Sequence, residues 1–257
     1  MSARDWFVRL GDDAPTRVFA FPHAGAGAAQ YASLAKRLRP GVAIWAANLP
    51  GRQARLDEPP IDDLDQLVDN LATQLAPVAG DRFAVFGFCG GAVVGLLVAR
   101  ALRDRGGPEP AALIVAAQEA PDVAHLPRET ARLSGQLLWR KLAADGGLPG
   151  DLATDVRLWT VSEPAVRADI AMFATYRHQP QPPLSCPITV CFGADDPAPR
   201  GAWLGWRRQS TGPLRLRRMA GGHWLLDDAG DELAEVLAEL SDARSPSPAD
   251  GRIGSRS

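Results

Sequence analysis

A short apolar run that ends in a cysteine flanked by glycines is the feature that most constrains how this chain can fold. Phe83–Phe88 is an apolar, β-rich run that leads into Gly87-Phe88-Cys89-Gly90-Gly91, and a helical pattern follows over Ala92–Arg105. Glycines on either side allow a turn sharp enough to hold Cys89 in a strained, exposed position. The sequence therefore predicts a strand, a sharp turn and a helix, with a nucleophile at the turn.

Apolar runs alternate with helical patterns along the chain and predict an α/β domain. The runs lie at Arg17–Phe21, Val42–Ala47, Phe83–Phe88, Ala111–Ala117, Ile188–Phe192 and Leu214–Met219, and the helical patterns at Tyr31–Leu38, Leu64–Leu75, Ala92–Arg105 and Glu232–Leu240. Near-continuous apolar runs indicate strands buried on both faces, so we expect a mostly parallel central sheet flanked by helices. Leu214–Met219 alternates leucine with arginine, which predicts a strand at the edge of the sheet.

Residues 121–183 interrupt this alternation of predicted strands and helices. They contain helical stretches at Leu133–Ala143 and Ala165–Tyr176 but no convincing strand. We expect a helical lid insertion over the carboxyl edge of the sheet, where it could exclude water and shape a substrate channel; an ordinary pair of packing helices is the alternative. Residues 1–120 and 184–240 would then form the core, and residues 241–257, rich in Ser, Pro, Asp and Arg, a disordered tail.

Composition narrows the class of function. The 257 residues are 46% hydrophobic and 23% charged, as in ordinary globular proteins, and the net charge of −2 gives no reason to expect nucleic acid or a membrane as partner. No run approaches a membrane helix and the N-terminus lacks a signal-peptide core, so we expect a cytoplasmic protein in which Cys89 is a free thiol. We also expect a monomer. Cys186 and Cys191 are expected to be structural, and no His or Cys pair has the spacing of metal ligands.

A cysteine nucleophile needs a base, a group that orients the base, and donors for the oxyanion. His223, in Gly221-Gly222-His223, follows the last apolar run and is the candidate base. Asp196, shortly after Ile188–Phe192, is the preferred acid because its carboxylate could accept the Nδ1 proton and fix the tautomer; Asp195 is the alternative. The order nucleophile, acid, histidine is typical of the α/β-hydrolase fold.

The loop after the first apolar run, Phe21-Pro22-His23-Ala24-Gly25, has the position of an oxyanion loop. The candidate donors are therefore the backbone N–H groups of Ala24 and Gly90. His23 precedes the nucleophile, so a structural hydrogen bond in the loop is preferred over a role as base. We also expect His23 and Phe88 to border the substrate, with the Phe88 ring giving a drier pocket. His125 and His178 fall in the insertion with no motif around them.

These segments together resemble the type II thioesterases, stand-alone α/β-hydrolases that accompany modular polyketide and nonribosomal peptide synthetases. The segments that carry the resemblance are Phe21-Pro22-His23-Ala24-Gly25, Leu49-Pro50-Gly51-Arg52-Gln53-Ala54-Arg55, the cysteine turn, Gly193-Ala194-Asp195-Asp196-Pro197 and Gly221-Gly222-His223. The resemblance spans about residues 17 to 240. It implies that an acyl group leaves the phosphopantetheine arm of an acyl or peptidyl carrier protein, forms an acyl-enzyme, and is released.

The resemblance also assigns roles. Nucleophile, acid and base map to Cys89, Asp196 and His223, and the oxyanion donors to Ala24 and Gly90. Arg52 matches a family arginine, although a salt bridge that braces the Pro50-Gly51 turn explains it equally well. The resemblance implies no cofactor beyond the phosphopantetheine of the partner.

The chain departs from the family at the turn. The family usually has Gly-His-Ser-Met-Gly where this chain has Gly87-Phe88-Cys89-Gly90-Gly91. Gly90 keeps its backbone donor but should open space above it. Attack by Cys89 on a thioester leaves an acyl-enzyme that is still an activated thioester.

Hydrolysis of that activated intermediate is the outcome we prefer, and ring closure to a lactam, lactone or Dieckmann-type product is the alternative. A third alternative, without catalysis, is an inactive module that binds a carrier protein. A lipase or general esterase fits the Phe21–Gly25 and Leu49–Arg55 segments poorly.

Overall fold

The computed structural model describes residues 5–80, 82–123, 128–199 and 201–242, and within these residues seven strands form one sheet. Its strand order is β1-β3-β2-β4-β5-β6-β7. In this described sheet β1 runs antiparallel to β3, and every other neighbouring pair is parallel. The strands are β1 (Phe7–Leu10), β2 (Thr16–Phe21), β3 (Val42–Ala47), β4 (Phe83–Phe88), β5 (Leu113–Ala116), β6 (Ile188–Gly193) and β7 (Leu214–Met219).

The predicted strands are all present, and β7 lies at the edge of the sheet as its alternating pattern predicted. Strand β1, at the opposite edge, was not predicted from the sequence. This strand is only four residues long, and its exposed side, at Arg9, hides the apolar signal. Its pairing continues beyond the strand, since the backbone N–H of Asn48 donates to the carbonyl of Trp6 at 2.9 Å.

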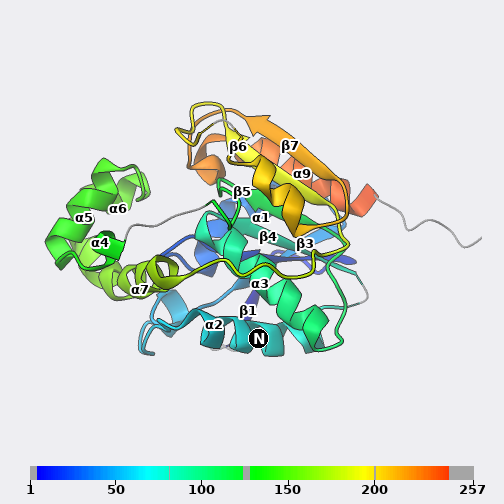
Figure 1. Ribbon diagram of the computed structural model, residues 1–257, viewed down its shortest axis with the longest axis horizontal. Coiled ribbons are helices and arrows are strands. Elements are labelled where there is room, and N and C mark those ends of the chain that lie inside the picture. The colour runs from blue at the N-terminus through cyan, green and yellow to red at the C-terminus, as the bar shows by residue number, and fades with distance from the viewer. Residues whose placement is uncertain (1–4, 81, 124–127, 200, 243–257) are drawn as a thin grey trace, which may run out of the picture.

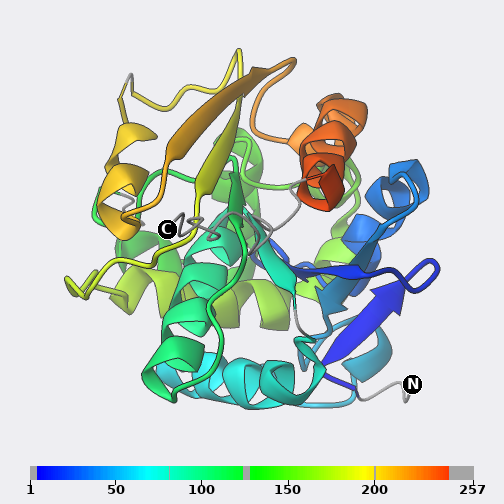
Figure 2. The same ribbon diagram turned by 90° about the vertical axis from the view of Figure 1, so that its right-hand side faces the viewer.

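Side chains that alternate along the central strands build one apolar core on each face of the sheet. In β2, Phe19 and Phe21 face helices α2 (Leu64–Leu75) and α3 (Gly90–Asp104), whereas Val18 and Ala20 face the opposite side. That second face is covered by α1 (Ala32–Arg37), α8 (Leu225–Asp228) and α9 (Gly230–Asp242). The two views show α1 beside α9, with α2 and α3 across the sheet from them (Figures 1 and 2). Burial of both faces accounts for the near-continuous apolar runs.

The helices follow their apolar spacing. In α2, Leu67, Leu71 and Leu75 recur every four residues and are buried, and the Asp63 carboxylate caps the helix by accepting from the N–H of Gln66 at 2.8 Å. Short 3₁₀ turns complete the connections at η1 (Ala28–Tyr31), η2 (Gln53–Arg55), η3 (Ala76–Val78) and η4 (Leu204–Gln209).

Four helices that lie between β5 and β6 in the chain form a separate group (Figure 1). They are α4 (Arg128–Ala131), α5 (Gly135–Ala144), α6 (Gly150–Thr154) and α7 (Val156–Thr175). We call these four the lid helices. They share an apolar cluster around Leu138, Trp159 and Ile170. The helix predicted at Ala165–Tyr176 begins too late, since the observed α7 starts at Val156. Helix α7 continues through Pro164, whose missing N–H removes one helical hydrogen bond without breaking the helix.

The carboxyl end of the chain differs slightly from expectation. Helix α9 runs to Asp242, so Ser241 and Asp242 belong to the helix and not to a tail. Residues 243–257, the rest of the predicted tail, lie outside the described residues. Among the residues that the structure describes, no helix is both long and apolar enough to cross a membrane.

Candidate active site

Cys89 stands at the sharp turn between β4 and α3, with backbone angles φ 52° and ψ −135°. A non-glycine residue with positive φ is uncommon, and the surrounding close contacts hold it there. A β-carbon on Gly91 would collide with the carbonyl oxygen of Phe21, and one on Gly87 with the backbone of Ala92. The Cys89 N–H donates to the carbonyl of Ala116 in β5 at 2.9 Å. Both glycines are therefore required for the turn, as the sequence indicated.

His223 and Asp196 approach each other from the loops that follow β7 and β6. The His223 Nδ1 lies 3.6 Å from the Asp196 Oδ2. The other carboxylate oxygen, Oδ1, accepts from the N–H of Ala198 at 2.9 Å, which fixes the orientation of the acid. The alternative acid, Asp195, is exposed, and its backbone N–H donates to the carbonyl of Gly221 at 2.9 Å. The geometry therefore favours Asp196 as the partner of the ring.

The surroundings of His223 favour a charged imidazolium. Burial alone would lower its pKa, but the Asp196 carboxylate and the Cys89 sulfur outweigh burial and raise the pKa of His223 to about 10. Burial opposes ionisation of Asp196 as well, yet the His223 ring and the Ala198 N–H lower the pKa of that carboxyl overall. A ring held between a carboxylate and a thiol is the arrangement in which histidine takes the proton of a cysteine nucleophile.

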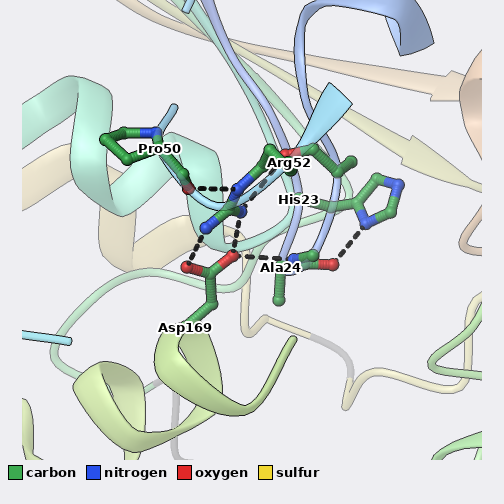
Figure 3. Close-up of polar contacts among 7 residues, drawn as sticks. His23, Ala24, Pro50, Arg52 and Asp169 are labelled. Atoms are coloured by element: carbon green, nitrogen blue, oxygen red, sulfur yellow. Dashed lines mark hydrogen bonds and ion pairs between the residues drawn. The ribbon is translucent and has the colours of Figure 1, made fainter. Parts of the chain in front are cut away.

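The loop after β2 brings Ala24 beside Cys89 and Gly90, and all three border the same cavity. The His23 ring bonds to this loop through Nδ1, which lies 2.9 Å from the carbonyl oxygen of Ala24 (Figure 3). Burial lowers the pKa of His23 to about 4, so the ring stays neutral and its Nδ1–H is the donor to that carbonyl. The structural hydrogen bond preferred from the sequence is thus present.

Phe88 occupies a different place from the one expected. Its ring is fully buried on the α1 and α9 side of the sheet, with ring centroids 5.9 Å from His23, 5.8 Å from His223 and 5.9 Å from Trp224. Neither Phe88 nor His23 borders the cavity. The reason is the alternation along β4, which turns Phe88 toward the same core as Phe86. Phe88 packs against the rings of His23 and His223 and does not line the cavity.

A cavity of about 490 Å³ lies between the sheet and the lid helices, a size typical of small-molecule sites. The core contributes Cys89, Asp196 and His223, and the lid helices contribute mainly apolar side chains such as Val166, Ile170 and Phe173. The space expected above Gly90 is filled, because a β-carbon there would lie 2.5 Å from the Phe173 ring. The lid helices thus pack directly onto Gly90, the residue after Cys89.

Some residues of the site carried no signal in the sequence. Trp224 follows His223, contacts its ring, and donates its indole N–H to the carbonyl of Gly146 in the lid at 3.0 Å. Glu119, just after β5, lies on the cavity wall, where burial and the nearby Asp196 raise the pKa of its carboxyl. Trp224 could have been noticed only from its position next to a candidate base. Glu119 has no motif around it.

Arg52 is buried against the lid and not simply against its own turn. Its guanidinium binds both carboxylate oxygens of Asp169 in α7, at 2.6 and 3.1 Å, and its Nε donates to the carbonyl of Pro50 at 3.3 Å (Figure 3). The brace on the Pro50-Gly51 turn expected from the sequence is therefore one part of a larger cluster. Nothing in the sequence paired Arg52 with a residue 117 positions away.

The remaining candidate residues lie apart from Cys89, Asp196 and His223. Cys186 and Cys191 are buried free thiols, and burial raises the pKa of each to about 12. The Nδ1 of His178 lies 3.1 Å from the Tyr176 hydroxyl, whereas His125 lies outside the described residues. The described part of the chain holds no group of three or more His, Cys, Asp or Glu residues that could bind a metal ion.

Comparison with known proteins places this fold and site in context. Residues 16–242 match the family described as Thioesterase domain. The chain is 31% identical over 238 residues to Thioesterase PikA5 of Streptomyces venezuelae, covering 91% of this chain and 84% of that protein. It is 26% identical over 237 residues to the gramicidin S biosynthesis protein GrsT of Aneurinibacillus migulanus, with 91% and 93% covered.

Solved structures give the same result. The type II thioesterase BorB from the borrelidin biosynthetic cluster superposes with a TM-score of 0.86 at 30% identity, covering 94% of this chain and 99% of that one. The RedJ thioesterase of the prodiginine pathway in Streptomyces coelicolor does so with a TM-score of 0.79 at 32% identity, covering 89% and 90%. The predicted α/β-hydrolase fold, with a mostly parallel sheet and flanking helices, is confirmed.

Proposed function

This chain belongs to the thioesterase family, and we propose that it removes acyl groups from the phosphopantetheine arm of a carrier protein in polyketide or nonribosomal peptide biosynthesis, through an acyl-enzyme on Cys89. The observation that carries the proposal is the convergence of Cys89, His223 and Asp196 on one cavity beneath the lid helices. GrsT is a gramicidin S biosynthesis protein and BorB is a type II thioesterase from the borrelidin biosynthetic cluster, which supports this class of substrate.

In the proposed acylation step, the thiol proton resides on His223 and the Cys89 sulfur attacks the thioester carbonyl. A bond forms between that sulfur and the acyl carbon, and the carbon–sulfur bond to the pantetheine arm breaks. His223 returns the proton to the departing thiol, while Asp196 stabilises the charged ring. The N–H groups of Ala24 and Gly90 receive the negative charge on the carbonyl oxygen, and the N-terminal end of α3 favours charge at this point.

Release follows by the same groups in reverse order. His223 takes a proton from water, the hydroxide adds to the acyl carbon, and the Cys89 thiol is regenerated as a free carboxylic acid leaves. The reactive thioester arrives on the carrier protein, so we propose no resident cofactor. The mainly apolar wall suits an acyl chain with much hydrocarbon.

Cyclising release is a second candidate, and Cys89 is the observation that favours it. A thioester acyl-enzyme stays activated toward internal nitrogen, oxygen or carbon nucleophiles. The lid helices line the cavity with mainly apolar side chains, which disfavours water beside the acyl-enzyme. Hydrolysis remains the first proposal because the family to which the chain belongs is defined by thioester cleavage.

Product analysis distinguishes these candidates. The protein is incubated with a long acyl-pantetheine thioester that carries a terminal amine or hydroxyl, and products are identified by mass spectrometry. We expect the free acid; a product lighter by one water would instead support ring closure. Thiol release without Cys89 acylation would contradict both.

Matched variants separate an enzyme from an inactive binding module. Cys89→Ala should abolish thiol release, whereas Cys191→Ala, which truncates a buried thiol away from the cavity, should retain it. Cys89→Ser should keep appreciable hydrolysis if cysteine serves only as nucleophile. If the activated thioester is required for ring closure, the serine variant should lose the cyclic product and form acid. A wild-type protein that binds a carrier but releases no thiol would indicate the inactive module.

A further inference from the structure

Helix α7 reaches the oxyanion loop through a buried carboxylate. Asp169 Oδ2 accepts from the backbone N–H of Gly25 at 2.7 Å and from the Arg52 guanidinium at 2.6 Å (Figure 3). Arg52 also donates to the carbonyl of Ala26 at 3.3 Å. The two side chains are each only 6% exposed. A lid helix, the loop after β2 and the loop after β3 therefore meet in one buried cluster.

Hydrogen bonds hold the peptide planes on both sides of Ala24: Asp169 helps to hold the plane after it, and the loop's own backbone holds the plane before it. The Ala24–Gly25 peptide is held at its carbonyl by the His23 ring and at its N–H by Asp169. The preceding peptide is held at the carbonyl of His23, which accepts from the N–H of Ala26 at 3.1 Å. A trans peptide directs its N–H away from its carbonyl. The Ala24 N–H therefore points away from the held carbonyl, and no other described residue accepts a hydrogen bond from it.

Packing makes the same connection. Gly25 has φ +80°, and a β-carbon there would collide with the Val166 side chain of α7. Val166 is itself buried and borders the cavity. The loop thus rests directly on α7, one turn of helix before Asp169.

Charge explains why Asp169 needs Arg52. A lone carboxylate next to the oxyanion loop would repel the negative charge that forms on the substrate carbonyl. Paired in two hydrogen bonds with Arg52, it can orient the Gly25 amide with no net charge on the pair. A buried ion pair of this kind is a weak source of stability, which leaves positioning as its distinctive contribution.

We propose that Asp169, held by Arg52, is a positioning residue that sets the Ala24 oxyanion donor, so that the docking of α7 determines whether the site can acylate. This inference rests on the proposed function, because it assumes that Ala24 binds the oxyanion. It assigns to the lid a role in the chemical step as well as in covering the cavity.

Two double variants, both without the Arg52 guanidinium, test the proposal. Arg52→Met/Asp169→Asn keeps an oxygen that can accept from Gly25, and Arg52→Met/Asp169→Leu removes it. Two rates are measured for each: thiol release from an acyl-pantetheine in a single turnover, and alkylation of Cys89 by iodoacetamide. Alkylation forms no oxyanion, and Cys186 and Cys191 are buried, so it reports on the Cys89–His223 pair alone.

We expect the leucine variant to acylate about 100-fold more slowly than the asparagine variant, as follows from an oxyanion donor misplaced by about 1 Å. Its alkylation rate should stay within about threefold and its KM should change little. Equal acylation by the two variants, or a parallel loss of alkylation, would overturn the proposal. Absence of acylation in the wild-type protein, with alkylation intact, would instead count against the proposed function.

A third variant covers failure to fold. Asp169→Glu keeps the charge pair but displaces the carboxylate by one methylene. If circular dichroism shows that the leucine variant is unfolded, slow acylation with normal alkylation in the Asp169→Glu protein supports the proposal. Acylation at the wild-type rate in that protein contradicts it.

Discussion

Gly193→Ala should disable the site from a position that contacts neither substrate nor nucleophile. Gly193 ends β6, and the loop that carries His223 passes directly over its α-carbon. A β-carbon placed there would lie 2.5 Å from the carbonyl oxygen of Gly221 and would collide with that of Gly222. Both obstacles are backbone atoms, so no side chain can rotate to relieve the contact.

The size of the effect follows from these contacts. Reaching an ordinary separation of about 3.5 Å requires the His223 loop to move by about 1 Å. Overpacking of this kind costs about 1–3 kcal/mol in the free energy of unfolding. The movement also draws the ring away from Asp196, already 3.6 Å distant, and a misplacement of about 1 Å costs about 100-fold in rate.

The neighbouring Gly222→Ala provides the matched control. Gly222 is adjacent to the base, yet a β-carbon there meets no atom within 4 Å. We expect kcat/KM for an acyl thioester to fall about 100-fold in Gly193→Ala and to change less than about threefold in Gly222→Ala. Urea unfolding should show the matching loss of stability only in the first variant. Equal effects of the two substitutions, or full activity in Gly193→Ala, would refute this reasoning.

Two further predictions concern the lid contact and the catalytic pair. Gly90→Ala should destabilise the protein by about 1 kcal/mol, because the added β-carbon meets the Phe173 ring. In a Phe173→Ala background the same substitution should instead stabilise the protein by up to about 1 kcal/mol, since alanine forms helices better than glycine. A double-mutant cycle from urea unfolding checks this change of sign, and additive effects would contradict it. The stability advantage of wild type over Asp196→Asn should depend on pH. The pKa of His223 is raised from 6.5 to about 10, so its contribution to the free energy of unfolding is complete below pH 6.5 and is lost as pH rises toward 10. The pKa of Asp196 is lowered from 3.8, so its contribution to that free energy is lost on acidification below that value. Unfolding free energies that differ by a constant amount from pH 5 to pH 10 would count against the pair.

Local sequence patterns were sufficient for the framework of the fold. Strands β2 and β4, buried on both faces, leave apolar runs that are hard to mistake, and α2 shows its apolar spacing and its Asp63 cap. Patterns failed where packing decides the outcome. Strand β1 is short and half exposed, and Pro164 lies inside α7, where the surrounding lid helices maintain a helix that the local sequence would end.

The candidate site divides in the same way. Cys89, Asp196 and His223 follow strand ends, and parallel strands bring their carboxyl ends to one edge, so chain order alone predicted their meeting. The direction in which a single side chain points was harder to predict from the sequence. Phe88 was expected to border the substrate but packs against the His223 ring, because the alternation of β4 and the adjoining Trp224 fix its ring there.

Long-range partners were beyond the reach of sequence patterns. Asp169 is one acidic residue on a lid helix, and only the fold brings it to Arg52 and Gly25. Phe173 likewise fills the space that Gly90 was expected to leave open. Such contacts depend on where the lid docks, and neither periodicity nor motif spacing encodes that position.

The most direct test of this account is to find where the acyl group resides during turnover. The protein is mixed with an acyl-pantetheine thioester, quenched in acid within milliseconds to seconds, and examined by intact and peptide mass spectrometry. We predict an acyl adduct on the peptide that contains Cys89, present in Cys191→Ala and absent from Cys89→Ala. Thiol release with no adduct on Cys89, or an adduct that persists in Cys89→Ala, would contradict the central claim that Cys89 is the nucleophile.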